Sequence, residues 1–414
     1  MGQFKFAQPV FEEVLVEDNL KDGYWLDAVD IDGDGRPDLI ASGLAEGEVV
    51  WYQNRSPKWI KHSMGSFPKP VAMDHAPLAN GRPDIAICHD YGTCMFSCKP
   101  EDGKISWLQH PGGDGSGPWQ RHYIADLVAT HRMRFGSFTR PGARELMALP
   151  VVGPQGGPEA VHAPVQVMLY TPPEGDKLTG PWPGSVVDDR SFRIIHDVVV
   201  GRFALNDRNA PLDSVLLATE EGVSWVHHQN GAWRTEILGT GEETEVGLTG
   251  FKGTGNLAVG RVGDDPYAYI ATLEPFHGNT VAVYTKGPGG KGLKGPWRRT
   301  ILDVFGDPND AGEGAGHHVM TADFDGDGDD EFLMALRGPW PWQGVFYYKC
   351  IDVENAVFVK KRVTTASAAR IAIGDFDGDG RIDFATTGYY TPGYFLCDQP
   401  RVMVFLNRTK QQAG

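Results

Sequence analysis

The sequence contains little cysteine, and its few thiols are poorly spaced for a metal site. Five of the 414 residues are cysteine, at positions 88, 94, 98, 350 and 397. Zinc sites built on cysteine usually combine two closely spaced pairs, whereas Cys94 and Cys98 form a single pair, so we expect no zinc on these thiols. In an oxidising compartment the same two residues would form a small disulfide loop, and the sequence leaves that question open.

Long apolar runs, basic clusters and several familiar catalytic motifs are also missing. No run of 18 apolar residues exists, so no membrane-spanning helix is expected. The net charge of −16 offers no basic face for nucleic acid. There is no GxSxG, HExxH or phosphate-cradling loop, so serine hydrolysis, zinc proteolysis and nucleotide transfer have no support. No obligate protein partner is indicated.

The first residues, "MGQFKFAQPVF", lack the apolar centre of a signal peptide. We expect an extracellular location, with a leader removed ahead of Met1. The sequons at 54–56 and 407–409 would permit glycosylation there.

What the sequence does have is a repeated unit of strand, acidic turn and strand. The clearest copies are "LDAVDIDGDGRPDLIA" (26–41), "TADFDGDGDDEFLMA" (321–335) and "IAIGDFDGDGRIDFAT" (371–386). Weaker copies at 72–87, 133–148, 198–218 and 257–271 bring the number to seven. A third apolar strand follows every copy, and a fourth strand follows six of them. Such a period is typical of a propeller, a solenoid or an array.

The missing fourth strand precedes the first copy. We expect "FEEVLVED" (11–18) to pair with "RVMVFLN" (401–407) and to close a ring. The sequence therefore predicts an all-β protein, a seven-bladed β-propeller of four-stranded blades that forms one domain over 1–414. A pair of β-sandwiches or a β-solenoid would not need the wrap-around strand.

The acidic turns resemble cation-binding loops. Oxygen ligands at alternate positions, with glycines for the sharp turn, suit a hard cation such as calcium, so we expect structural calcium. The alternative is an acidic turn that needs no metal, and a catalytic role is disfavoured because four copies have lost the ligands. The expected ligands are Asp30, Asp32, Asp34, Asp38, Asp323, Asp325, Asp327, Glu331, Asp375, Asp377, Asp379 and Asp383.

The direction of the chain places a different set of residues opposite the acidic turns. The loops that enter each first strand, and those joining second to third strands, must share the other end of the propeller. "THRMR" (130–134) is one such entry, so its histidine and arginines should point into the mouth of the central channel. Expected substrate-binding residues are Tyr24, Arg132, His196, Asn256, His277, His317, Trp340, Arg370 and Tyr394, and candidates for proton transfer are His131, His75, His89 and Tyr390.

Clustered imidazoles, tyrosines and arginine can hold a cation, abstract a proton and neutralise an anion. Tryptophan and tyrosine at the rim suit the faces of sugars. The cluster favours an enzyme over a non-catalytic sugar-binding propeller, which remains an alternative.

Seven segments carry a resemblance to a known family over about residues 11 to 407. They are "DGYWLDA" (22–28), "PVAMDH" (70–75), "ISWLQHPG" (105–112), "THRMRFGSFTR" (130–140), "FHGNTVAVYTK" (276–286), "ILDVFGDPN" (301–309) and "TPGYF" (391–395). They resemble the propeller of fungal aldos-2-ulose dehydratase and the rhamnose–glucuronate lyases that share it. The resemblance implies a carbon–oxygen lyase acting on sugars by β-elimination, and it matches His131 with the catalytic histidine of the dehydratase.

Two departures shape the expected activity. The dehydratase continues into cupin domains, whereas this chain ends at Gly414, and Asp74 separates "PVAM" from His75 where the dehydratase has histidine at once. We therefore expect cleavage of L-rhamnose from a terminal glucuronate of an arabinogalactan-type glycan such as gum arabic. Dehydration of a keto-sugar, 1,5-anhydrofructose or glucosone, is the alternative.

The expected elimination needs a base, an anion-stabilising group and an acid. His131 is the leading base, with His75 and then His89 as rivals. Arg132, Arg370 or a bound calcium would neutralise the carboxylate, and Tyr390 or a second histidine would protonate the departing oxygen. A further divalent cation at the central site is an open possibility.

Overall fold

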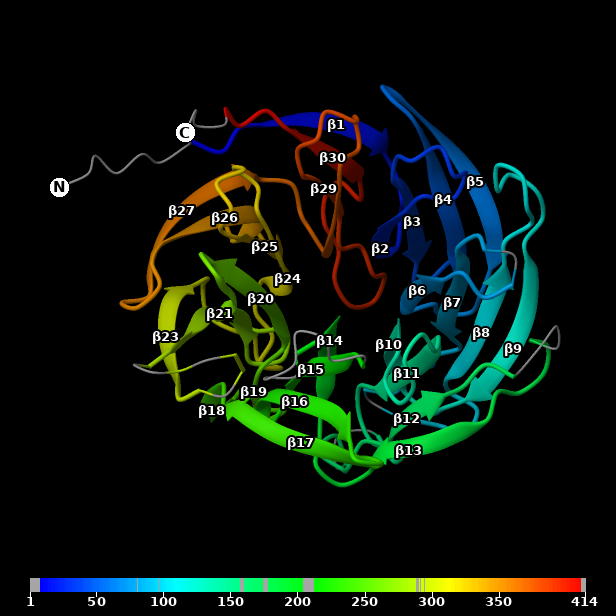
Figure 1. Cartoon of the computed structure of the whole chain (residues 1–414), viewed down its shortest axis with the longest axis horizontal. Coiled ribbons are helices and arrows are strands. Elements are labelled where there is room, and N and C mark those ends of the chain that lie inside the picture. The colour runs from blue at the N-terminus through cyan, green and yellow to red at the C-terminus, as the bar shows by residue number, and fades with distance from the viewer. Residues whose placement is uncertain are drawn as a thin grey trace.

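Seven four-stranded antiparallel sheets surround a central axis, as Figure 1 shows for the computed structural model. The structure describes residues 8–79, 81–95, 97–156, 160–173, 178–203, 212–287, 290, 292–293 and 295–410. The ends of the expected 1–414 domain and part of the repeat at 198–218 lie outside these residues. The described residues contain no helix that could cross a membrane.

The blades follow one another along the chain, each running outward from the axis. Blade one is β2 (Gly23–Val29), β3 (Asp38–Gly43), β4 (Glu48–Arg55) and β5 (Lys58–Ser66). Blade two is β6 (Ala72–Ala76), β7 (Asp84–His89), β8 (Lys104–Gln109) and β9 (Gln120–Asp126). Blade three is β10 (Thr130–Gly136), β11 (Glu145–Pro150), β12 (Val167–Tyr170) and β13 (Gly184–Asp188). Blade four is β14 (Ile195–Gly201), β15 (Ser214–Thr219), β16 (Gly222–Gln229) and β17 (Ala232–Gly239).

The remaining blades keep the same order. Blade five is β20 (Asn256–Val262), β21 (Asp265–Glu274), β22 (Thr280–Lys286) and β23 (Trp297–Val304). Blade six is β24 (Gly316–Ala322), β25 (Glu331–Arg337), β26 (Gln343–Asp352) and β27 (Val357–Thr364). Blade seven is β28 (Arg370–Gly374), β29 (Asp383–Thr387), β30 (Val402–Asn407) and the N-terminal β1 (Phe11–Glu17). A small hairpin, β18 (Glu242–Val246) and β19 (Phe251–Gly253), connects blades four and five.

The N-terminal strand closes the ring as predicted. β1 is antiparallel to β30, with Phe11 opposite Asn407 and Leu15 opposite Met403. Figure 1 shows this strand, in blue, beside the red C-terminal strand. The seven blades and their four-stranded sheets are confirmed.

Burial follows position within the blade. Second strands such as β3, β7 and β25 are buried at every residue, because neighbouring blades cover both of their faces. Outer strands such as β5 expose most of their side chains. The core therefore lies between blades, and the loops at the ends of the strands are available to form a functional site.

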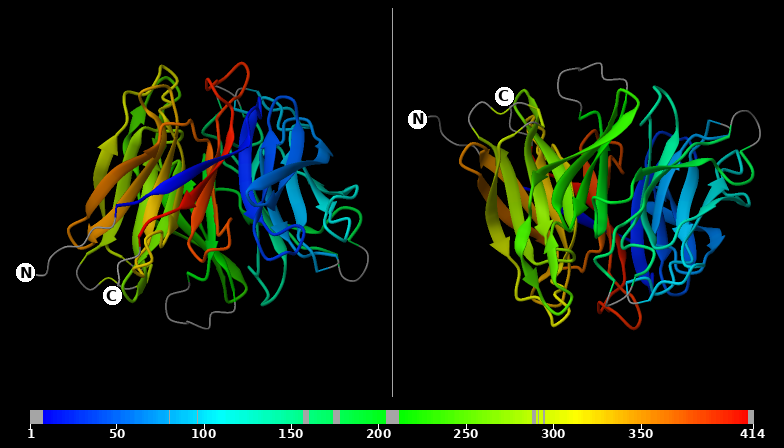
Figure 2. Two further views of the ribbon diagram at one scale, coloured as in Figure 1. Left: turned by 90° about the horizontal axis from the view of Figure 1, so that it is seen from above. Right: turned by 90° about the horizontal axis from the view of Figure 1, so that it is seen from below.

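The two ends of the axis carry different loops, and Figure 2 shows the sheets edge-on between them. The turns from first to second strands form one end, which we call the acidic face. The loops from second to third strands, and those entering each blade, form the opposite end, which we call the mouth face.

The sequence left open whether Cys94 and Cys98 form a disulfide, and in the structure both have free thiols. Cys94 and Cys98 are not bonded to each other, and the Cys98 Sγ lies 3.4 Å from the Cys94 carbonyl oxygen.

Candidate active site at the mouth of the propeller

Four histidines meet where the central channel opens on the mouth face, and we call them the histidine cluster: His131, His196, His277 and His317. Ring centroids lie 5.3 Å apart for His131 and His196, 4.4 Å for His196 and His277, and 5.0 Å for His277 and His317. All four side chains are almost completely buried.

A repeated irregularity in the inner strands positions three of these histidines. The pairing register shifts at Thr130/Arg132 in β10, at Ile195/Asp197 in β14 and at Gly316/His318 in β24. The extra residue of each bulge is a histidine of the cluster. A bulge re-aims one side chain while the rest of the strand stays paired. In β2 the same shift, at Gly23/Trp25, supplies Tyr24.

Backbone carbonyl groups fix the tautomers of two histidines. The Nδ1 of His196 lies 2.9 Å from the Gly255 oxygen, and the Nδ1 of His317 lies 2.6 Å from the Ala369 oxygen. Because a carbonyl oxygen can only accept, each Nδ1 carries the hydrogen and each Nε2 keeps a lone pair. The Nε2 of His317 has no hydrogen-bond partner among the described residues.

The donor set suits a transition metal better than calcium. His196, His277 and His317 offer ring nitrogens that all lie within 4.8 Å of one another. Imidazole ligands with their other nitrogen held by a carbonyl are typical of zinc sites, whereas calcium takes oxygen ligands. These three histidines would therefore suit a zinc-like ion as the predicted central cation.

Electrostatics keep the cluster uncharged. Burial lowers the pKa of His131 well below its usual value, and the charges of Arg132 and Arg370 lower it further. Burial and neighbouring cations lower the pKa values of His196 and His317 in the same way. At neutral pH all three imidazoles are neutral and can accept a proton.

His131 has the surroundings of a base. The Tyr24 hydroxyl lies 2.7 Å from its Nε2, and the Arg132 Nη1 lies 3.1 Å from the same atom. Its Nδ1 has no partner among the described residues. A neutral imidazole with a tyrosine hydroxyl on the same nitrogen can exchange a proton with a bound sugar.

The predicted arginines and asparagine lie one level deeper in the channel. Arg370 stacks 3.8 Å from the centroid of the Trp25 ring, and its Nη2 lies 3.0 Å from the Nε2 of His318. Asn256 is fully buried, and neither atom of its amide has a hydrogen-bond partner within the described chain. Arg132 joins this level to the cluster, with its Nη2 3.3 Å from the His196 Nε2.

Three predicted proton-transfer residues do not join the cluster. The structure places His75 away from the cluster, because β6 has no bulge and His75 pairs with Ile85 near the acidic end of the strand. His89 is buried inside blade two, where Asp90, Ser106 and Arg121 occupy its ring nitrogens. Among the described residues, the hydrogen bond found for Tyr390 runs from its backbone N–H to the Gly23 carbonyl oxygen.

Its neighbour Tyr389 takes the place predicted for Tyr390. The Tyr389 ring is buried, 4.7 Å from the His317 ring and 5.7 Å from the Tyr24 ring. Because the two tyrosines are adjacent in sequence, the path of the loop decides that Tyr389 and not Tyr390 faces the cluster.

Sequence reasoning also missed two charged residues beside His277. Glu313 lies 3.5 Å from the His277 Nδ1, and Arg337 pairs with Glu313 at 3.0 Å. "DAGEGAG" (310–316) around Glu313 has no motif that would identify it. Arg337 ends a buried apolar strand, and a charge at such a position was the available signal.

Exposed aromatic residues line the rim as predicted. Trp340 is 63% exposed, and Trp342 and Tyr394 are 40% and 42% exposed. Tyr394 also contacts the cluster, with its hydroxyl 3.2 Å from the His277 Nδ1. The mouth face therefore exposes aromatic side chains, one of which contacts the histidine cluster.

The three acidic loops lie at the opposite end and are tied to the backbone. Asp38, Glu331 and Asp383 each accept the N–H of the residue seven positions earlier, at 2.8–2.9 Å. The grouped carboxylates that offer one another ligand atoms are Asp30, Asp32 and Asp38; Asp323, Asp325 and Glu331; and Asp375, Asp377 and Asp383.

The fourth predicted ligand of each loop lies outside these groups, and a basic side chain that contacts it also contacts a grouped carboxylate of the same loop, Asp32, Asp325 or Asp377. Asp34 pairs with Arg36 and Arg55, Asp327 with Lys349, and Asp379 with Arg381 and Arg408. Three of the four predicted ligands in each loop therefore lie close enough together to share one ion, and calcium binding there stays a prediction.

Blade six differs from the other two acidic blades because the cation among its carboxylates is a buried lysine, whereas Arg55 in blade one and Arg408 in blade seven are partly exposed. The Lys349 Nζ lies 2.7 Å from Asp325, 2.8 Å from Asp327 and 2.9 Å from Glu331. An ammonium group thus occupies the position predicted for calcium. One oxygen of Asp325 and one of Asp377 in blade seven still lack a partner within the described chain.

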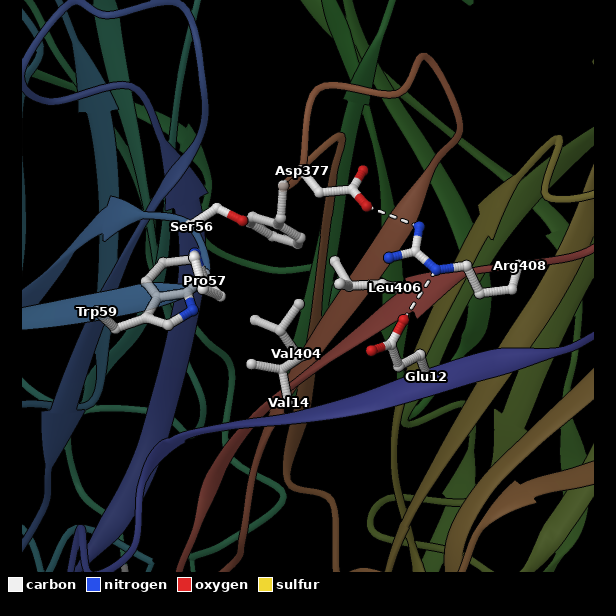
Figure 3. Close-up of a pocket in the computed structure, with 10 residues that line it drawn as sticks. Glu12, Val14, Ser56, Pro57, Trp59, Asp377, Val404, Leu406 and Arg408 are labelled. Carbon is white, nitrogen blue, oxygen red and sulfur yellow. Dashed lines mark hydrogen bonds and ion pairs between the residues drawn. The ribbon is translucent and has the colours of Figure 1, made fainter.

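A pocket of about 200 Å³ lies elsewhere, at the closure between blades one and seven (Figure 3). Arg408 bridges Glu12 and Asp377 on its wall, and Trp59 packs against Phe376 on the other side. Both of its carboxylates form ion pairs with Arg408.

The fold and this site define a seven-bladed propeller whose channel opens onto buried, neutral imidazoles. Comparison with known proteins adds a likeness in sequence. The family model for the β-propeller domain of aldos-2-ulose dehydratase matches residues 102–287. Aldos-2-ulose dehydratase of Phanerodontia chrysosporium is 35% identical over 97% of this chain. The chain spans 46% of the length of that relative.

The predicted resemblance to the dehydratase propeller is therefore confirmed, and the likeness to rhamnose–glucuronate lyases stays a prediction. Two solved structures give loose likenesses. The PQQ-bound aldose sugar dehydrogenase of Streptomyces coelicolor has a TM-score of 0.45 and 11% identity, covering 98% of this chain and 100% of its own. AofleA of Arthrobotrys oligospora has a TM-score of 0.42 and 9% identity, covering 86% and 91%.

Proposed function

We propose that this protein is a carbon–oxygen lyase that dehydrates a keto-sugar by β-elimination. The observation that carries the proposal is the neutral, buried His131, whose Nε2 shares a hydrogen bond with Tyr24 at 2.7 Å. The 35% identity to a protein named aldos-2-ulose dehydratase supports the same reaction class. Dehydration of a keto-sugar is the alternative to glycan cleavage that the sequence predicts.

The reaction breaks one carbon–hydrogen and one carbon–oxygen bond and forms a carbon–carbon double bond. His131 accepts the proton from the carbon next to the carbonyl, a role that needs a neutral imidazole. Tyr24 is placed to protonate the hydroxyl that departs as water. Arg132, 3.1 Å from His131, adds positive charge where the enolate develops.

His196, His277 and His317 would hold a zinc-like cation. When bound, such a cation would polarise the sugar carbonyl as a Lewis acid. The protein's own contribution is to present three unprotonated ring nitrogens beside the base and to exclude water from them, since all four imidazoles are buried.

The test uses the chain as it is, supplied with zinc and incubated with 1,5-anhydrofructose or glucosone. We expect a product one water lighter, with the ultraviolet absorbance of a conjugated enone. His131→Ala should abolish this product and leave the fold intact. Binding of both sugars without any product would instead support a non-catalytic sugar-binding propeller.

Glycan cleavage remains a second candidate because the rim extends beyond the histidine cluster. Trp340, Trp342 and Leu396 are exposed on the mouth face, more apolar surface than a single small sugar needs. Buried Arg132 and Arg370 suit a carboxylate. Release of free rhamnose and of an unsaturated uronate from gum arabic would favour this candidate over the keto-sugar.

A structural role for calcium is proposed for the acidic face. Grouped carboxylates and open glycine turns support it in blades one and seven. Lys349 competes with such an ion in blade six.

A further inference from the structure

We propose that the central channel binds a small inorganic anion, a halide such as chloride, one level deeper than the histidine cluster. The anion would be held by the indole N–H of Trp25 and the guanidinium groups of Arg132 and Arg370, which we call the guanidinium site. The inference goes beyond the proposed function and does not depend on it, because it concerns how the buried charge of the channel is neutralised.

Side chains from three blades meet at one indole ring. Trp25 belongs to β2 in blade one, Arg132 to β10 in blade three and Arg370 to β28 in blade seven, all inner strands around the axis (Figure 1). The Cζ of Arg370 lies 3.8 Å from the centroid of the Trp25 ring, and the Cζ of Arg132 lies 5.3 Å from it. The face of an indole attracts cations, which accounts for this stacking. The ring offers no acceptor, however, to the N–H groups of either guanidinium.

Both arginines are buried without a carboxylate partner. Among the residues that the structure describes, no carboxylate oxygen lies within 4.0 Å of either guanidinium group. Asp197 and Asp27 act on Arg370 electrostatically from a greater distance. A buried charge without a partner is strongly destabilising. These two groups therefore require a partner that the described part of the chain does not supply.

The open polar atoms of the guanidinium site are all hydrogen-bond donors. They are the Nε1 of Trp25, the Nε of Arg132, and the Nε and Nη1 of Arg370, each buried and without a hydrogen-bond partner within the described chain. Guanidinium and indole N–H groups can only donate. A water molecule would bring hydrogens that need acceptors of their own, whereas a halide ion only accepts. An anion therefore suits this set of atoms better than water does.

His318 adds to the excess of donors. Its Nε2 lies 3.0 Å from the Arg370 Nη2, and its Nδ1 lies 3.1 Å from the backbone nitrogen of Ile371. A neutral imidazole carries one hydrogen and accepts on one nitrogen only. The His318 ring thus cannot accept from both of these N–H groups, and it leaves the open hydrogens of Arg370 unsatisfied.

The position of the open atoms favours a small ion over the carboxylate of a sugar. The terminal nitrogens of Arg132 face the histidine cluster, with Nη1 3.1 Å from the His131 Nε2 and Nη2 3.3 Å from the His196 Nε2. The open atom of this guanidinium is instead its Nε, which is nearer to the backbone of β10. Trp25 is completely buried beside it. The histidines therefore lie between the mouth and the open donors.

The first experiment locates the ion. Crystals grown without halide are soaked in sodium bromide and measured at the bromine absorption edge, where bromide gives an anomalous signal. We expect a peak within hydrogen-bond distance of the Trp25 Nε1 and the Arg370 guanidinium. Bromide peaks confined to the protein surface would mean adventitious ions only and would overturn the proposal.

The second experiment measures the affinity for chloride through stability, which does not depend on how fast the ion exchanges. Urea unfolding is followed at several chloride concentrations, with gluconate keeping the ionic strength constant and chelator keeping metal off the histidines. Above the Kd, each tenfold rise in chloride should raise the folding equilibrium constant about tenfold for one site. A folding equilibrium that is indifferent to chloride would contradict the proposal.

Two substitutions test the donors separately. Arg370→Met removes the open Nε and Nη1 and should weaken chloride binding about 10–100-fold, the usual effect of losing hydrogen bonds to a charged group. Trp25→Phe keeps an aromatic ring and removes one N–H, so it should weaken binding about tenfold or less. Unchanged affinity in Arg370→Met, or in Trp25→Phe should Arg370→Met fail to fold, would refute the assignment of these donors.

Arg337 provides a matched control. It is also a buried arginine stacked on aromatic rings, but its Nη2 has a carboxylate partner, Glu313, at 3.0 Å. Arg337→Met should lower stability and keep the dependence on chloride. If Arg337→Met and Arg370→Met lost that dependence equally, the effect would belong to general loss of buried charge and the proposal would fail.

Sodium glucuronate distinguishes an inorganic ion from the carboxylate of a substrate. We expect glucuronate to leave the bromide peak in place. If glucuronate displaced bromide, Arg132 and Arg370 would serve a sugar acid and the inorganic site would be excluded. None of these measurements requires turnover, so failure of the proposed dehydration would leave the anion site unaffected.

Discussion

The mouth and the acidic face are opposite ends of the same inner strands, yet they differ in which polar groups the fold satisfies. At the acidic face, Asp38 gives one oxygen to the N–H of Ile31 and the other to the N–H of Asn54. At the mouth, the His131 Nδ1 and the His317 Nε2 are buried without a partner within the described chain. Buried polar atoms that a fold leaves open are costly, and because one oxygen each of Asp325 and Asp377 is open at the acidic face as well, both ends offer atoms to a ligand.

The two ends also differ in the sign of their response to acid. Burial and nearby cations lower the pKa of the histidines at the mouth, to about 4 for His277. At the acidic face burial outweighs the hydrogen bonds and raises the pKa of Asp38 to about 7 and that of Glu331 to about 8. The same sheets thus hold bases that resist protonation at one end and acids that resist ionisation at the other.

The largest expected effect separates activity from stability at the mouth. His131→Ala should lower kcat by about two to four orders of magnitude, the usual contribution of a general base. Steady-state kinetics on 1,5-anhydrofructose measure the change, and the melting temperature should stay close to that of the unsubstituted protein. His75→Ala is the control and should keep normal turnover. An inactive His75→Ala beside an active His131→Ala would reverse the assignment.

The next effect concerns the cation built into blade six. Lys349→Met leaves Asp325 and Glu331 buried without their ammonium partner, which should lower the free energy of unfolding by about 3 kcal/mol. Urea unfolding in chelator measures this loss, and added calcium should restore part of it.

Arg55→Met in blade one is the control for Lys349. The Arg55 side chain is 41% exposed, so its contacts with Asp32 and Asp34 should contribute less than about 1 kcal/mol. Equal losses in the two variants would mean that blade six has no special internal cation.

A smaller loss of stability is expected when Asp38, which binds the backbone of blade one, is changed. Asp38→Asn turns one acceptor into a donor that faces the backbone N–H of Ile31 or Asn54, at a cost of about 1–3 kcal/mol. Urea unfolding at pH 8 measures the loss, and kcat should not change. Asp34→Asn, which alters an exposed loop position, should change stability little. A fall in kcat without a fall in stability would break the division between the two faces.

The smallest expected effect is a change in how the free energy of unfolding of the metal-free protein depends on pH. Histidines with lowered pKa values give stability that is complete above about pH 6.5 and is lost as pH falls toward 4. Asp38, with its raised pKa, gives stability that is present below about pH 4 and is lost as pH rises through 7. The two trends oppose each other between these limits.

Removal of Asp38 should expose the trend of the histidines. Between pH 4.5 and 6.5 the stability of Asp38→Asn should rise with pH more steeply than that of the unsubstituted protein, by up to about 1.4 kcal/mol per pH unit. Urea unfolding at several pH values, with chelator present, gives both slopes. Identical slopes would show that the Asp38 pKa is not raised.

The sequence by itself determined the ring. Seven copies of one unit, with the strand at 11–18 as the missing partner of 401–407, specify blade number and closure, because each copy buries its apolar strands only against a neighbour. The acidic loops could also be recognised in the sequence, because their carboxylates are neighbours along the chain.

Only the tertiary structure decided which residues form the site. Side chains alternate along a strand, so one inserted residue decides whether a histidine faces the channel. Bulges in β10 and β24 turn His131 and His317 to the mouth, and their absence from β6 leaves His75 at the other end. Glu313 reaches His277 from another blade. Such contacts depend on loop paths between blades, which no local pattern of residues encodes.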